Sequence, residues 1–359
     1  MKTRTAPGRG RVRISRVVPT VLAAIILVAG ISLVIHARFV GAGGGSGTGW
    51  QVDGLAGDTV HYLVIGHGPK PVAFAATESG VYRRGAAGSW KRVLAQSGVW
   101  SVDLLPDNRT VIAGDQQGNV DLSTDAGLQW RAARVTTDAV YAVMFVGASR
   151  GTILAGAGGG LFRSVDGGAT WLRRLPLHDS AIAAFTHSPA SDRVIFAGAV
   201  ASSSAGATGV YVSRDAGYTW SPYGRRLQSG GGIMALASGA GSRLLAGTMG
   251  QAIWVVGAAT STWARTAAGL PTRDDHVAGI ALVSGEPDTA YIGTLGFGVF
   301  ETRDGGRHWA NVSDGLRGST NAMIVLSLAY SSADHILYAG TSTGVYRLET
   351  THRGAIRGS

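Results

Sequence analysis

The sequence predicts an all-β fold built from one repeated unit, and two observations support this. Glycine accounts for 55 of the 359 residues and charged residues for only 15%, which favours short strands joined by tight turns over helices. Tryptophans also recur at intervals of 40, 40, 41, 49, 43 and 46 residues, a spacing typical of propeller blades. These tryptophans are Trp50, Trp90, Trp130, Trp171, Trp220, Trp263 and Trp309.

Each interval contains the same order of short strands. Residues 277–315 show it best, with VAGIALV as the inner strand, TAYIGT as the second, GVFETRD as the third and HWANVSDGL as the outer strand. The glycine-rich run at 156–160 reads as a tight turn between two strands. We expect inner strands to begin near residues 59, 99, 139, 181, 232, 277 and 323. The sequence therefore predicts a seven-bladed β-propeller of four-stranded blades.

The last blade lacks an outer strand of its own. The segment WQVDGL at 50–55 matches the outer strands WANVSDGL at 309–316 and WARTAAGL at 263–270. We therefore expect the N-terminal segment to close the last blade, because closure removes open sheet edges. The propeller would then cover residues 50–350, followed by a tail at 351–359.

The segment before the propeller is typical of a membrane anchor. Val17–Ile35 is a run of 19 residues without a charge, and at about 1.5 Å per residue a helix of this length spans roughly 28 Å. Basic residues without any acid precede it, which places the N-terminus in the cytoplasm and the propeller outside. We expect a basic cytoplasmic tail at 1–16, a transmembrane anchor at 17–37 and a glycine-rich linker at 38–49. A cleaved signal peptide is the alternative, because Val40, Gly41 and Ala42 resemble a cleavage site.

The net charge of +10 lies mostly at the ends of the chain. Removing the basic residues of 1–38 and 353–359 leaves +1 for residues 39–352, so the body is a poor match for nucleic acid. The chain has no cysteine, which excludes disulfides and thiolate metal sites. Its histidines show no metal-binding spacing. We expect a monomeric propeller that binds the membrane through residues 17–35, without nucleic acid, metal or cofactor.

One eight-residue pattern occurs four times, between the third and outer strands of a blade. An aspartate in such a turn can accept hydrogen bonds from backbone N–H groups, the glycine tolerates a positive φ, and the tryptophan covers the hairpin. We therefore interpret these residues as structural. They are Ser123, Asp125, Gly127 and Trp130; Ser164, Asp166, Gly168 and Trp171; Ser213, Asp215, Gly217 and Trp220; and Thr302, Asp304, Gly306 and Trp309.

The pattern resembles the Asp-box, or bacterial neuraminidase repeat. Proteins with such boxes include sialidases, xyloglucanases, sortilin-type receptors and photosystem II assembly-factor propellers. A single ring behind a predicted anchor is most similar to the last of these. The resemblance implies a propeller fold but leaves the function open.

No catalytic site stands out. A sialidase-type site would imply an Arg-Ile-Pro motif and a Tyr–Glu pair, but Arg-Ile-Pro is absent and glutamate is scarce. We therefore expect a non-catalytic propeller that binds a protein or surface glycan on the outer membrane face, in an assembly or scaffold role. An exo-acting glycosidase of sialidase-like type is the alternative.

The candidate binding residues lie in loops that share one face of a propeller. Four arginines from three successive connections would form a cationic patch for a carboxylate, a phosphate or an acidic protein segment, although a solvated rim remains the simpler interpretation. Paired acids for glycosidic chemistry are a weaker alternative at 274–275, because adjacent loop residues rarely face one bond. The candidates are Arg225, Arg226, Arg273, Asp274, Asp275, His276, Phe297 and Arg317, with His178, Asp179 and Trp100 on the same face.

Overall fold

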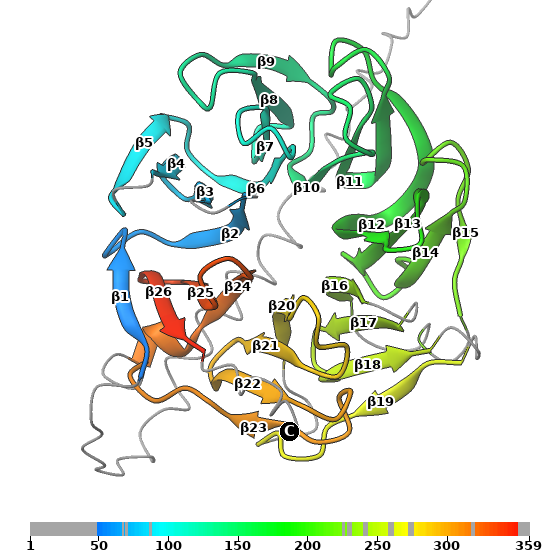
Figure 1. Cartoon of the computed structure of the whole chain (residues 1–359). Coiled ribbons are helices and arrows are strands. Elements are labelled where there is room, and N and C mark those ends of the chain that lie inside the picture. Colours follow the sequence, from blue (N-terminus) through cyan, green and yellow to red (C-terminus); the bar gives the residue numbers. More distant parts are fainter. Residues whose placement is uncertain are drawn as a thin grey trace, which may run out of the picture.

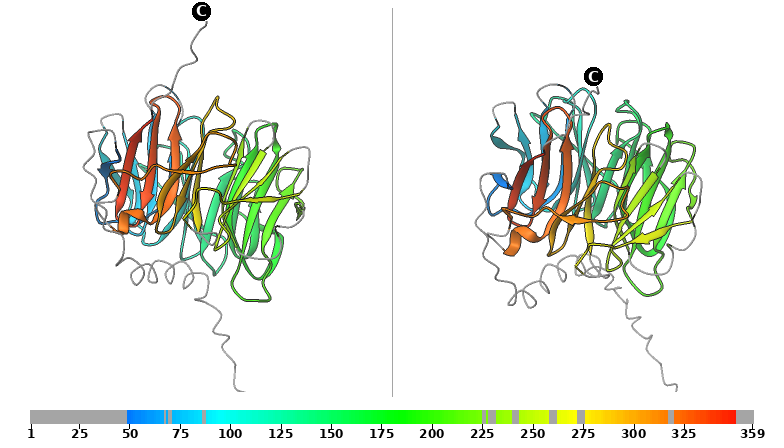
Figure 2. Two further views of the ribbon diagram at one scale, coloured as in Figure 1. Left: turned by 90° about the horizontal axis from the view of Figure 1, so that it is seen from below. Right: turned by 60° about the horizontal axis from the view of Figure 1, so that its bottom comes forward.

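The strands of the computed structural model surround a central axis, and the inner strands follow one another in a closed ring (Figure 1). Seen from the side, the ring is a thick disc whose strands run between its two faces (Figure 2). The structure describes residues 49–66, 68, 71–85, 88–224, 227, 232–239, 243–257, 262–271, 276–316 and 320–350.

Within these residues the strands form six antiparallel sheets. The first two sheets are β2 (Val60–Ile65), β3 (Ala73–Thr77), β4 (Gly80–Arg84) and β5 (Trp90–Leu94), then β6 (Val99–Leu104), β7 (Val111–Asp115), β8 (Asn119–Ser123) and β9 (Arg131–Arg134). The third sheet contains β10 (Val140–Phe145), β11 (Ile153–Ser164), β12 (Leu172–Ser188), β13 (Ser191–Ala201), β14 (Gly209–Ser213) and β15 (Ser221–Pro222). The fourth contains β16 (Ile233–Gly239), β17 (Arg243–Thr248), β18 (Ile253–Val256) and β19 (Ala264–Thr266). The fifth contains β20 (Val277–Leu282), β21 (Ala290–Thr294), β22 (Gly298–Thr302) and β23 (Ala310–Asn311). The sixth contains β24 (Val325–Ser331), β25 (Ile336–Thr341), β26 (Gly344–Glu349) and β1 (Gln51–Gly54), and the short 3-10 helix η3 (Thr320–Met323) precedes β24.

The prediction of seven separate four-stranded blades is wrong, because the sheets of the described chain number six. The third and fourth predicted blades share the six-stranded sheet β10–β15. Strand β11 has 12 residues and β12 has 17, so both continue through segments where turns were predicted. The glycine run at 156–160 bends inside β11 but stays paired with β12, through Gly158 opposite Ala181 and Gly160 opposite Pro176. This sheet therefore supplies two inner strands to the ring, β10 and the later part of β12.

The predicted closure by the N-terminal segment is confirmed. Strand β1 pairs antiparallel with β26, with Gln51 opposite Arg347 and Val52 opposite Tyr346. Trp50, directly before β1, is only 5% exposed and packs in the hydrophobic cluster between the fifth and sixth sheets. Its indole Nε1–H donates to the carbonyl of Val312 at 2.7 Å. The two ends of the propeller are thus held together in one sheet.

No helix in the part of the chain that the structure describes is long and apolar enough to cross a bilayer. The apolar run at 17–37 lies outside the described residues. The structure therefore corrects the predicted fold, which included a transmembrane helix, and gives no support to a single-pass membrane location.

The core lies between neighbouring sheets. Phe74 and Val81 of the first sheet, for example, pack against Val102 and Val111 of the second. Trp263 and Trp309 are 1% and 3% exposed and fill equivalent spaces farther round the ring. Because apolar side chains occupy both faces of each sheet, the inner strands are held rigidly around the axis.

Candidate functional site

A cavity of about 580 Å³ lies on the axis of the ring. Residues of all the inner strands line it, from β2, β6, β10, β12, β16, β20 and β24. A concave site of this volume is within the range of ligand pockets.

Each of these inner strands has a register shift directly after a buried valine or isoleucine, which stands at the start of the strand or, in β12, at Ile182 where its later part begins. A bulge turns the extra residue away from the regular alternation, and here every such residue lines the cavity. The bulge residues are His61, Trp100, Tyr141, Ala183, Met234, Ala278 and Leu326. We call this set the bulge ring.

The bulge ring is aromatic on one side only. His61, Trp100 and Tyr141 come from the adjacent strands β2, β6 and β10. Ring centroids are 4.3 Å apart between His61 and Trp100 and 5.9 Å apart between Trp100 and Tyr141, both tilted. The other side carries smaller or aliphatic side chains. Among the described residues, the indole Nε1–H of Trp100 has no hydrogen-bond partner.

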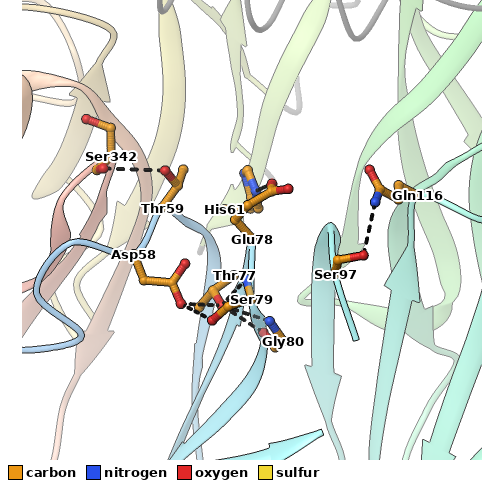
Figure 3. Close-up of polar contacts among 10 residues, drawn as sticks. All are labelled: Asp58, Thr59, His61, Thr77, Glu78, Ser79, Gly80, Ser97, Gln116 and Ser342. Atoms are coloured by element: carbon orange, nitrogen blue, oxygen red, sulfur yellow. Dashed lines mark hydrogen bonds and ion pairs between the residues drawn. The ribbon is translucent and has the colours of Figure 1, made fainter. Parts of the chain in front are cut away.

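Polar contacts on the loops around β2 hold His61 in place (Figure 3). Its Nε2 lies 3.2 Å from Oε2 of Glu78, and this hydrogen bond holds the pKa of Glu78 below its usual range. Asp58 accepts hydrogen bonds from the hydroxyls of Thr77, at 2.9 Å, and Ser79. The loop that leads into β2 is thereby tied to the β3–β4 turn that carries Glu78.

Deeper in the cavity, Asp103 and His187 hold the free edge of β10. Asp103 Oδ2 accepts the N–H of Phe145 at 2.8 Å, and His187 Nε2 lies 2.9 Å from the carbonyl of the same residue. Because that carbonyl can only accept, His187 donates from Nε2. Burial lowers the pKa of His187, which favours the neutral ring.

Burial also raises the pKa of Asp103 to about 6, although hydrogen bonds from the backbone of Phe145 and Leu104 offset part of the effect. Desolvation inside the ring and the nearby Asp103 raise the pKa of Tyr62, although 45% of this residue is still exposed. The described residues that line the cavity include two carboxylates, Asp103 and Asp192, and no lysine or arginine. The cavity therefore has an acidic character.

The four repeated turns share one geometry, seen clearly at 164–171. The Ser164 hydroxyl donates to Asp166 Oδ1 at 2.7 Å and accepts the N–H of Gly168 at 2.8 Å. Asp166 also accepts the N–H and the hydroxyl of Thr170, and these hydrogen bonds, that of the Thr170 hydroxyl foremost, hold the pKa of the carboxyl well below its usual range. Gly168 has a φ of 85°, and its carbonyl accepts the indole N–H of Trp171 at 3.1 Å. The other turns repeat the Ser/Thr–Asp hydrogen bond at 2.8 to 2.9 Å.

Residues 211–222, which contain the third of these turns, match the family model of the BNR/Asp-box repeat. The chain is therefore a β-propeller that carries the Asp-box repeat. A comparison with curated proteins gave no match.

Solved structures with the same fold as this Asp-box propeller include enzymes and binding proteins. The GH74 xyloglucanase from Xanthomonas campestris has a TM-score of 0.68 and 18% identity over 86% of this chain, which spans only 55% of that enzyme. The protein YCF48, solved bound to a D1 peptide, has a TM-score of 0.62 and 14% identity over 88% of this chain and 99% of its own. The WD40 repeats of RRP9 have a TM-score of 0.64 and 14% identity over 85% and 99% of the two chains. At these identities the likeness shows the fold alone.

Most of the predicted cationic patch of this Asp-box propeller lies outside the described residues, namely Arg225, Arg226, Arg273, Asp274, Asp275 and Arg317. The patch therefore stays a prediction. His276 is half-buried, and its carbonyl accepts the N–H of Leu295. Phe297 packs against the hydrophobic cluster between the fourth and fifth sheets, so much of its ring is withdrawn from the surface.

The sequence pointed to Trp100 as a candidate but not to its neighbours in the bulge ring, His61 and Tyr141. A signal for them exists, because each directly follows the first valine of an inner strand, as Trp100 does. Simple alternation along a strand does not reveal it, because the bulge changes which residues face the axis.

Proposed function

We propose that this propeller binds a segment of a partner protein at the mouth of its central cavity, without catalysing a reaction on it. The observation that carries the proposal is the one-sided aromatic arc of His61, Trp100 and Tyr141 on the bulge ring.

The arc has the properties of a recognition surface. Aromatic side chains offer large rigid contacts at low entropic cost, and tryptophan and tyrosine are enriched where interfaces concentrate their binding energy. The smaller residues Ala183 and Ala278 elsewhere on the bulge ring leave room for the bound segment.

A structural neighbour supports a peptide as the ligand, since YCF48 was solved with a D1 peptide bound. That protein shares the fold over nearly its whole length, whereas the xyloglucanase contains roughly as much chain again beyond the matched part. The single ring of the present chain is therefore more comparable with the peptide-binding neighbour.

Selection from a random peptide library tests the proposal. We expect enriched peptides to bind the wild-type protein and to lose at least tenfold in affinity against Trp100→Ala and Tyr141→Ala. Tyr218→Ala is the matched control, because Tyr218 is 47% exposed and belongs to an Asp-box turn, outside the cavity lining. Peptides that bind the Trp100 variant as well as the wild type would refute the site.

Glycoside hydrolysis is a second candidate, favoured by one feature of the cavity. A carboxyl group with a pKa of about 6, such as that of Asp103, suits a proton donor. However, its Oδ2 already accepts the N–H of Phe145. The hydrogen-bonded pair Tyr291 and Glu301, 2.9 Å apart, contributes to a sheet interface and does not line the cavity.

Incubating the purified protein with sialosides and aryl glycosides tests this candidate. Turnover that is lost in Asp103→Asn, or in variants of Asp274 and Asp275, would favour the enzyme over the binding propeller.

A further inference from the structure

We infer that the cavity recognises a basic side chain, an arginine or lysine, carried by the bound segment. The inference rests on the proposed peptide site at the bulge ring and specifies its ligand chemistry.

The charges around the site point to a cation. Asp103 and Asp192 line the cavity, and the described lining contains no lysine or arginine to neutralise them. Glu78 does not line the cavity, but it lies beside His61 with 58% of its side chain exposed, so it adds a third carboxylate next to the bulge ring. The net negative charge attracts a cation to this site, whereas an acidic segment would be repelled.

The aromatic residues and the deepest of these acids occupy the same sector of the ring. Trp100 and Asp103 are three residues apart on β6, about 10 Å along the strand. Tyr141 on β10 and Tyr62 on β2 flank them. A long basic side chain entering at the mouth can therefore pack its aliphatic stem against Trp100 and Tyr141 while its charged head points toward Asp103.

Asp103 has the capacity to bind such a head group. A carboxylate offers about four acceptor sites, and the backbone of Phe145 and Leu104 uses two. Within the described chain Asp103 forms no salt bridge, and the raised pKa of its carboxyl reflects burial without a compensating cation. A neutral apolar occupant would leave this carboxylate desolvated and unpaired, which disfavours it relative to a guanidinium or ammonium group.

Indole NMR of the whole protein with ¹⁵N-labelled tryptophan tests the inference. The chain has nine tryptophans, and Trp100→Phe identifies the signal of Trp100. The probes are the N-acetyl amides of arginine, lysine, glutamate and norleucine. We expect the arginine and lysine probes to shift the Trp100 signal in a saturable way, and the glutamate and norleucine probes to leave it in place.

The variant that decides is Asp103→Asn, which keeps an acceptor for the Phe145 N–H while it removes the charge. We expect it to weaken arginine binding at least tenfold with the other indole signals unchanged. Asp288→Asn is the control, because Asp288 is 69% exposed, outside the cavity lining, and its loss should leave arginine binding as in the wild type.

The inference would be overturned by the absence of a saturable shift with the arginine probe, or by equal affinity in Asp103→Asn. Library peptides that depend on Trp100 but carry no basic residue would also overturn it, and would leave the proposed peptide site standing. If no peptide depends on Trp100, the proposed site itself fails.

Discussion

Ring closure by the N-terminal strand makes Trp50 one of the residues most sensitive to substitution. Its side chain is 5% exposed and packs with Tyr291, Val299 and Leu316, which lie in the C-terminal part of the sequence. Truncating a buried tryptophan to alanine costs about 3–5 kcal/mol through lost transfer energy and a cavity. Leaving the Val312 carbonyl without its 2.7 Å hydrogen bond adds about 1 kcal/mol. We therefore expect Trp50→Ala to lower the free energy of unfolding by roughly 4–6 kcal/mol.

A loss of that size is comparable with the total stability of many domains, about 5–15 kcal/mol, so the variant should unfold at a much lower urea concentration. The measurement is equilibrium urea unfolding of the wild type, Trp50→Ala and Trp50→Phe, with Val52→Ala as the control because Val52 is 63% exposed on β1. Trp50→Phe should fall between the wild type and the alanine variant, since it keeps part of the packing and loses the hydrogen bond. If Trp50→Ala unfolds within the error of Val52→Ala, the N-terminal strand does not stabilise the ring.

The remaining predictions concern an Asp-box, the cavity and the predicted cationic patch. Asp166→Ala should lower the melting temperature, because Ser164 and Thr170 lose the carboxylate that accepts their hydrogen bonds. Peptide binding should be unchanged. Normal melting with abolished binding would show that the turn is a binding site. The pKa of Asp103 is raised to about 6 in the folded state, above its unfolded value of 3.8, so ionisation of this group disfavours the fold. The melting temperature of the wild type should therefore rise relative to that of Asp103→Asn as the pH is lowered from 7.5 to 5, with the change centred near pH 6. Identical pH profiles of the two proteins would contradict the raised pKa. Changing all four arginines of the patch to serine should weaken capture of an acidic partner and flatten its salt dependence while the fold is retained, and an unchanged salt response would reject the patch. These arginines are Arg225, Arg226, Arg273 and Arg317.

Local sequence patterns were sufficient to predict the strands and the closure of the ring. Strands of alternating or buried residues between turn residues are short-range features, so their periodicity is readable without the fold. The match of WQVDGL to the other outer strands placed β1 beside β26, because every outer strand has the same neighbour and the same burial on one face. The Asp-box turn is equally local, since its hydrogen bonds link residues two to four positions apart.

The number of sheets and the site depended on contacts between distant residues. Whether the glycine run at 156–160 ends a strand is decided by its pairing with β12, about 20 residues later, and sequence alone predicted a turn. The direction of His61 and Tyr141 follows from a bulge, which exists only relative to the strand paired beside it. Asp103 shares a sector with these aromatic residues because β2, β6 and β10 are adjacent in the closed ring. The sequence thus determined the repeated units and how they join, whereas the tertiary structure decided which side chains face the axis, because that depends on the pairing of whole strands.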